Sequence, residues 1–125
     1  MWQWFHQLAS PRWFYQASGK FLPWISVLGL FFISLGLLWG LGFAPQDAKQ
    51  GNSFRIIYIH VPSSFLALAG YYIMAAAGAI AVIWKIKLAD IVMKVAAPIG
   101  AAFTFVALLT GAIWGKPTWG TYWIW

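Results

Sequence analysis

The feature that most constrains this chain is a run of 23 residues, 21–43, that contains no charged side chain. A helix rises about 1.5 Å per residue, so this run can cross the roughly 30 Å hydrocarbon core of a bilayer. Two more uncharged runs of similar length follow, at 62–84 and 95–114. The sequence therefore predicts an all-α membrane protein with three transmembrane helices.

Proline and glycine mark the expected ends of these spans. Pro62 is expected to begin the second helix, because proline suits a first turn and disfavours helix in the residue before it. Residues 115–117, Gly-Lys-Pro, are expected to stop the third helix. Pro98 lies either near the first turn of that helix or at a kink in a helix that begins earlier, near Asp90.

The composition excludes several other classes of protein. Hydrophobic residues make up 62% of the 125 residues and charged residues only 8%, against roughly 25% charged in an ordinary soluble domain. The chain has no cysteine, which excludes disulfides and thiolate metal sites. Its net charge of +6 comes from dispersed basic residues. That pattern favours membrane topology and argues against nucleic acid as a partner.

The distribution of lysine and arginine predicts the orientation. One side of the spans carries five of these residues: Arg12, Lys20, Lys85, Lys87 and Lys94. The other side carries three: Lys49, Arg55 and Lys116. The positive-inside rule therefore predicts a cytoplasmic N-terminus and places His60 and the C-terminal tail on the outer side.

The first 20 residues are expected to form an interfacial arm and not a cleavable signal, since they lack a small-x-small cleavage site. Ser10 and Pro11 can open a short helix that closes at Gly19. Three aromatic residues of this arm are expected at headgroup depth: Trp2, Phe5 and Trp13.

Small residues at a spacing of four predict the faces by which the spans pack. The pairs are Gly36 and Gly40, Ala96 and Gly100, and Ala107 and Gly111. Such pairs let two helix backbones approach closely.

The residues 115–125 form a tryptophan-rich tail directly after the third span. Together with Trp114, this segment holds four of the ten tryptophans, the others being Trp119, Trp123 and Trp125. Anchoring one helix end needs only one or two rings, so the segment suggests a surface that a flat apolar ligand covers. An ordinary aromatic belt is the alternative interpretation.

His60 is the histidine on the expected outer side, close to the start of the second span. An ionisable residue at a membrane boundary is a functional candidate, and neutral imidazole is the form that binds a metal such as haem iron. Alternatively, His60 is an interfacial residue bonded to Ser63, Ser64 or the loop backbone. Arg55 on the same loop can pair with anionic groups of a ligand.

No arrangement typical of an enzyme is visible. Asp47 and Asp90 are expected on opposite sides of the membrane, which excludes a catalytic pair of carboxylates. A Ser-His-Asp arrangement and a glycine-rich phosphate loop are also missing from the sequence.

Several blocks of the sequence resemble a known family. They are WFHQLASP at 4–11, RIIYIHVP at 55–62, APIG at 97–100, Phe103-Thr104, WGKP at 114–117 and WGTYWIW at 119–125. These blocks are similar in order and spacing to the tryptophan-rich haem-handling family of bacterial cytochrome c maturation, and in particular to its haem exporter C branch. The resemblance covers essentially the whole chain.

The resemblance implies a multi-pass protein of the bacterial inner membrane that is not an enzyme. It implies transient binding of b-type haem at the periplasmic face, transfer to a membrane-tethered haem chaperone, and association with ATP-driven transporter subunits. His60 matches a first axial ligand, and Trp119, Trp123 and Trp125 match the platform on which haem lies. The family pattern continues with an aspartate, further spans and a second histidine, so we expect this chain to correspond to the N-terminal half of a six-span protein.

A different function remains open from the sequence. The chain can be a structural membrane subunit or a permease fragment in which the tryptophans are only interfacial anchors.

Overall fold

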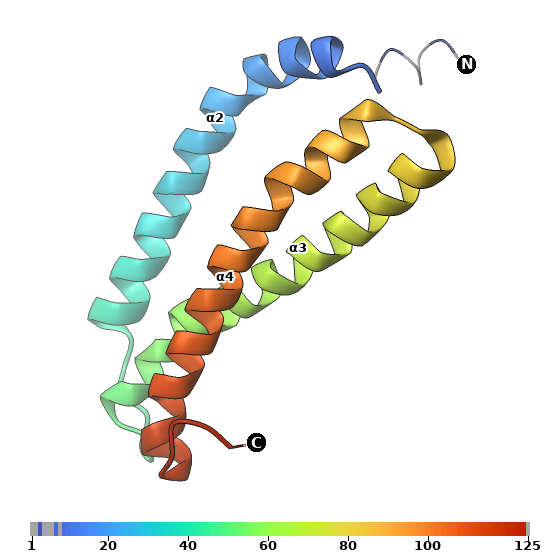
Figure 1. Cartoon of the computed structure of the whole chain (residues 1–125). Helices are drawn as coiled ribbons and strands as arrows, with labels where there is room; N and C mark the ends of the chain where they lie inside the picture. The colour runs from blue at the N-terminus through green and yellow to red at the C-terminus, as the bar shows by residue number, and fades with distance from the viewer. Residues whose placement is uncertain (1–2, 4–6, 8, 125) are drawn as a thin grey trace.

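The computed structural model describes residues 3, 7 and 9–124, and most of these residues are helical (Figure 1). The elements are α2 (Pro11–Leu37), the π-helical segment η1 (Leu38–Phe43), the 3₁₀ segment η2 (Asn52–Ile56), α3 (Ile57–Trp84) and α4 (Lys87–Trp119). Three stretches are long and apolar enough to cross a membrane: Pro11–Phe43, Asn52–Trp84 and Lys87–Trp119. The all-α class and the three spans are thus confirmed.

The N-terminal arm differs from the expectation. Pro11 occupies the first position of α2 after Ser10, as predicted, but the helix continues through Gly19 and Pro23. Residues 11–20 are therefore continuous with the helix of the first span, and they form no separate interfacial helix. A continuous helix pairs most backbone groups within the segment, and pairing of this kind is what lipid demands. Trp2 and Phe5 lie outside the described residues.

The second and third spans are also longer than predicted. Helix α3 begins at Ile57, directly after η2, so Pro62 lies inside the helix. Helix α4 begins at Lys87, and Pro98 and Pro117 both lie within it. Proline is tolerated here because membrane helices can satisfy the freed carbonyls in other ways.

The end of α4 shows why residues 115–117 do not stop it. Gly115 is buried and helical, whereas Gly120 adopts φ +80°, the left-handed conformation of a helix C-cap. The backbone N–H of Gly120 donates to the carbonyl of Lys116 at 2.9 Å. The non-helical part of the tail described here is therefore only residues 120–124.

Helices α3 and α4 form an antiparallel hairpin (Figure 1). Only Lys85 and Ile86 connect them, and Lys85 takes φ +53° to make the turn. Midway along the pair the two backbones meet at glycine: a Cβ on Gly70 would lie 3.1 Å from Cα of Gly100. The expected packing role of Gly100 is confirmed, although its partner Gly70 was not predicted.

Helix α2 is attached to this hairpin mainly near its C-terminal end. None of its residues is buried. At the junction, Gly40 of η1 makes room for the ring of Tyr58, whose Cγ would lie 2.5 Å from a Cβ at position 40. The start of α2 and the α3–α4 turn lie at one end of the molecule, and residues 44–51 and the tail lie at the other (Figure 1).

Candidate functional site

The site is built around His60, near the start of α3, where the end of α4 and the tail come beside it. Together they enclose a hollow of about 480 Å³, which lies within the range of ligand pockets. We call it the His60 hollow. Its lining residues are His60, Ala107, Leu108, Gly111, Ala112, Trp114, Trp119, Thr121, Tyr122, Trp123 and Ile124.

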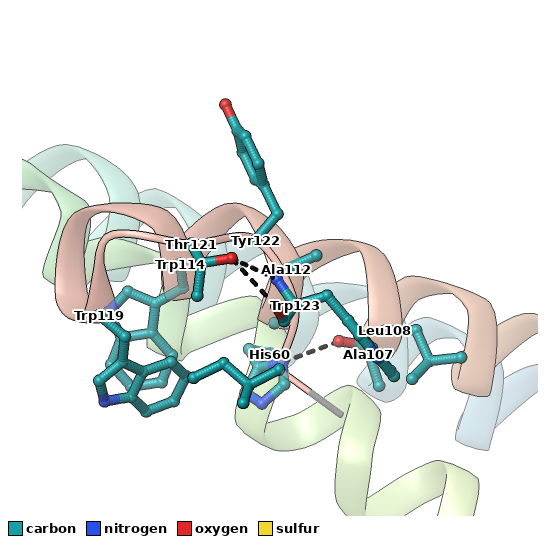
Figure 2. A pocket seen from close by; sticks show the side chains of 11 residues that line it. His60, Ala107, Leu108, Ala112, Trp114, Trp119, Thr121, Tyr122 and Trp123 are labelled. Carbon is teal, nitrogen blue, oxygen red and sulfur yellow. Dashed lines mark hydrogen bonds between the residues drawn. The ribbon is translucent and has the colours of Figure 1, made fainter.

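Hydrogen bonds to α4 set the tautomer of His60. Its Nδ1 lies 3.0 Å from the carbonyl oxygen of Ala107 (Figure 2). The same nitrogen lies 3.1 Å from Oγ1 of Thr110. A carbonyl only accepts, so Nδ1 carries the proton. The Thr110 hydroxyl donates to the carbonyl of Val106 at 2.7 Å, which leaves its oxygen free to accept from Nδ1. The lone pair of the neutral ring is therefore on Nε2, the arrangement of a metal-ligating histidine.

The sequence also allowed an interfacial His60 whose ring is bonded by Ser63, Ser64 or the loop backbone. Ser64 donates to the backbone carbonyl of His60 at 2.8 Å and does not bond its ring. The ring is instead held by groups about fifty residues away in the sequence. Such a fixed orientation is what a ligand position requires.

Gly111 makes space for the imidazole. A Cβ at this position would lie 2.9 Å from Cε1 of His60, closer than side chains normally tolerate. The predicted spacing of Ala107 and Gly111 is thus used at the site: one residue supplies a carbonyl to the ring and the other supplies room for it.

Trp114 forms a second wall of the hollow. Its ring meets His60 edge-on, with 5.8 Å between centroids and 63° between planes. Its Nε1 donates to Oε1 of Gln50 at 2.8 Å. Both polar atoms of this half-buried contact are therefore paired, and the indole is fixed in place.

Trp119 and Trp123 line the hollow from the end of α4 and the tail (Figure 2). Buried Gly115 lies under Trp119, since a Cβ there would be 3.3 Å from Cε3 of that ring. Trp119 is 70% exposed and Trp123 is 50% exposed. The hollow therefore offers aromatic surface that the described part of the chain leaves uncovered. Trp125, the last predicted platform residue, lies outside the described residues.

Lysine and threonine hold the tail against the end of α4. Lys116 Nζ donates to the carbonyl of Gly120 at 3.0 Å and lies 5.2 Å from the centroid of the Tyr122 ring. Figure 2 shows this ring pointing away from His60. Thr121 Oγ1 donates to the carbonyl of Trp123 at 3.0 Å. These contacts fix the turn that brings residue 123 to the hollow.

Arg55 does not line the hollow. Its Nη1 donates to the carbonyl of Leu41 at 2.8 Å, and its Nη2 donates to the carbonyl of Ala44 at 2.9 Å. It thus caps the end of η1, and a direct contact with an anionic ligand stays a prediction.

Asp47 organises the loop between η1 and η2. Its Oδ1 accepts from the backbone N–H groups of Gln50 and Lys49, both at 2.8 Å. These two bonds, that of Gln50 first, hold the pKa of the exposed carboxyl below its usual value. The loop is therefore most regular when Asp47 is ionised.

The part of the chain described by the structure contains no group of three histidine, cysteine or acidic residues that could hold a metal ion. Asp90 pairs with Lys94 at 2.8 Å on the exposed surface of α4. It lies in the first turn of α4, whereas Asp47 lies in the loop between η1 and η2. The chemistry open to the His60 hollow is thus ligation by one imidazole and contact with aromatic rings.

The sequence analysis did not predict the roles of three residues of the site. They are Gln50, Thr110 and Gly111, the last in its contact with the His60 ring. Gln50 and Thr110 each act on a ring that is 64 or 50 residues distant. The one signal in the sequence was the spacing of Ala107 and Gly111, which indicated a packing face but not its partner.

Comparison with known proteins decides the family. A family model described as Heme exporter protein C matches residues 4–125. The chain belongs to this family. A Heme exporter protein C of Escherichia coli (strain K12) is 49% identical over 125 residues, which are 100% of this chain and 51% of that protein. A relative of the same name from Haemophilus influenzae is 50% identical over the same shares.

More distant members of the Heme exporter protein C family also match. The relative from Bradyrhizobium diazoefficiens is 43% identical over 118 residues, which are 94% of this chain and 44% of that protein. The chain thus spans about half the length of the curated relatives it matches. The resemblance to this family is confirmed, and so is the expectation that the chain covers about half the length of its relatives.

Proposed function

We propose that this chain carries a haem-presenting site of the bacterial inner membrane, at which His60 ligates the iron and Trp114, Trp119 and Trp123 contact the macrocycle. The observation that carries the proposal is the pairing of Nδ1 with Ala107 and Thr110 beside an aromatic hollow. This pairing leaves Nε2 as the ligating nitrogen. Membership of a family named for haem export supports the same cargo.

The chemistry of the donor set fits haem. One neutral imidazole is a common axial ligand, and an aromatic, partly exposed surface suits a flat apolar ring. A hollow that stays open on one side also suits cargo that must leave again. We propose Trp125 as part of the same platform, Arg55 as a partner for anionic groups of the cargo, and the periplasm as the side on which the site lies.

The proposal extends to the whole assembly. A site open at the membrane surface would pass haem to a membrane-tethered haem chaperone, and ATP-driven transporter subunits of cytochrome c maturation would associate with the spans. The exposed apolar side chains of α2 are available for such contacts in the bilayer. In this role the protein binds and transfers haem without making or breaking covalent bonds.

The direct test is titration of the purified chain with haemin in detergent, followed by the Soret band. We expect His60→Ala to shift the band and weaken binding by about tenfold or more, because the iron loses its imidazole. Ser64→Ala is the matched control, since Ser64 bonds only the backbone carbonyl of His60. An unchanged spectrum for His60→Ala would leave the tryptophans as membrane anchors only.

A further inference from the structure

The loop between η1 and η2 reaches the site through the side chain of Gln50. Its Oε1 accepts from Nε1 of Trp114 at 2.8 Å, a bond between residues that are 64 apart in the sequence. Trp114 in turn meets His60 edge-on at 5.8 Å. Resting on the function proposed above, we propose that Gln50 is a positioning residue that holds the Trp114 indole as a fixed wall of the His60 hollow.

The backbone of Gln50 is itself held in place. Its N–H donates to Oδ1 of Asp47 at 2.8 Å, and its carbonyl accepts from the N–H of Ser53 at 3.2 Å. Asp47 and Gly51 exchange two backbone hydrogen bonds, of 2.9 and 3.3 Å. Gly51 takes φ +56°, which favours glycine. The side chain of Gln50 therefore projects from a turn whose backbone is held by hydrogen bonds.

The turn is also fixed to the helices on both sides. Arg55 of η2 donates to the carbonyls of Leu41 and Ala44, which lie at and just after the end of η1. The loop thus spans two elements that are tied together at its base. A rigid base lets one hydrogen bond from Gln50 restrain an indole on a different helix.

Restraint matters because an indole at this position can otherwise rotate about its side-chain bonds. A ring that turned toward His60 would occupy the space needed by cargo, and a ring that turned away would remove an apolar wall. One acceptor at a fixed place selects a single orientation. Gln50 therefore fixes the wall of the hollow beside His60 without lining the hollow itself.

The test compares Gln50→Leu with Gln50→Glu in the intact chain. Leucine has a similar size but no acceptor, whereas glutamate keeps an oxygen at the same place. Gln46→Leu is the matched control, because Gln46 is an exposed residue of the same loop. The indole N–H signals are recorded by NMR with ¹⁵N-labelled tryptophan, and Trp114→Phe identifies the signal of Trp114.

For Gln50→Leu we expect the Trp114 N–H signal to move upfield and to exchange faster with solvent, and haemin affinity to fall by about tenfold, as for other outer partners of a ligand site. Gln50→Glu should keep both the Trp114 signal and the haemin affinity close to those of the parent chain. The unfolding temperature should change little in either variant. An unmoved Trp114 signal in Gln50→Leu overturns the proposal. So does a loss of stability with unchanged haemin affinity, which would make Gln50 purely structural.

The outcome for His60→Ala separates this proposal from the proposed function. If that variant binds haemin normally, the function fails while the NMR signal still decides whether Gln50 holds Trp114. If His60→Ala loses binding and Gln50→Leu does not, the function stands and the role of Gln50 is wrong.

Discussion

Helices α3 and α4 meet at Gly70 and Gly100, and again at His60 and Gly111, about three helical turns farther along α4. At the first place glycine lets two backbones touch, since the atom nearest to an added Cβ is a Cα of the other glycine. At the second place glycine makes room for a side chain, because the nearest atom is Cε1 of His60. The same residue type therefore serves packing in one region and presentation of a ligand in the other.

The two regions also differ in polarity. Near Gly70 and Gly100 the Thr104 hydroxyl donates to the carbonyl of Gly100, within α4 itself. Around Gly111 the bonds run between helices, from His60 to Ala107 and Thr110. Bonds between helices orient a side chain relative to the other helix, whereas the bond of Thr104 stays within its own helix. Substitutions in the first region should thus affect stability, and those in the second should affect haem binding.

The largest effect is expected from Gly70→Leu. A Cβ there already lies 3.1 Å from the Gly100 backbone, so a larger side chain must separate the helices. Overpacking of this kind costs about 1–3 kcal/mol. We expect a clear fall in the unfolding temperature, followed by circular dichroism in detergent. Gly29→Leu in α2 is the control, because nothing lies within 4 Å of its Cβ position. Equal losses in both variants would contradict a packing role specific to Gly70.

A smaller but more selective effect is expected from Gly111→Ala. The added methyl group lies 2.9 Å from Cε1 of His60 and must displace the imidazole. We expect haemin affinity to fall several-fold, by about tenfold at most, while the unfolding temperature stays close to that of the parent chain. Gly100→Ala is matched to it, since its methyl group would make an ordinary 3.7 Å contact. If Gly100→Ala lowered affinity as much, the two regions would not be distinct.

Thr110→Val should have a still smaller effect. It removes one of the two acceptors beside Nδ1 of His60 but leaves the carbonyl of Ala107. We expect the His60 ring to keep its tautomer. The affinity of the chain for haemin should fall by about two- to fivefold, less than the usual loss when a hydrogen-bond partner of a ligating histidine is removed. Nitrogen NMR of the imidazole reports the tautomer directly. Thr110→Ser should restore the affinity, and a failure to do so would point to packing by the methyl group.

The smallest effect concerns acid. The N–H groups of Gln50 and Lys49 lower the pKa of Asp47. The stability that ionised Asp47 contributes is therefore present above the unfolded pKa, and it is lost as pH falls through the lowered folded pKa. We expect the loop bonds to loosen only in acid, below about pH 4. The Trp114 N–H signal, titrated with pH, would show this step. Asp47→Ala should lack the step, and its persistence there would assign it to another group.

The three spans could be predicted because three long uncharged runs are separated by short segments that contain charged residues. Their ends could not, since Pro62 and Pro117 are tolerated inside helices and the capping glycine is Gly120 and not Gly115. A glycine shows its role only through its surroundings: Gly115 is used for close approach of Trp119, and Gly120 for its positive φ.

The candidate residues His60 and Trp114 could be recognised from the sequence, because an ionisable group and an unusual density of indoles stand out in an apolar chain. The structure brings these two together with Trp119 and Trp123 and leaves Arg55 outside the lining. The groups that orient them could not be recognised. Gln50 and Thr110 are common polar residues whose role depends on which helix faces which, and one sequence does not encode that pairing in any local pattern.

The two-residue turn at Lys85 and Ile86 has a consequence for membrane insertion. With so short a connection, α3 and α4 can cross a bilayer only as an antiparallel pair. Whichever way that pair is delivered, His60 and Trp114 emerge on the same face of the membrane.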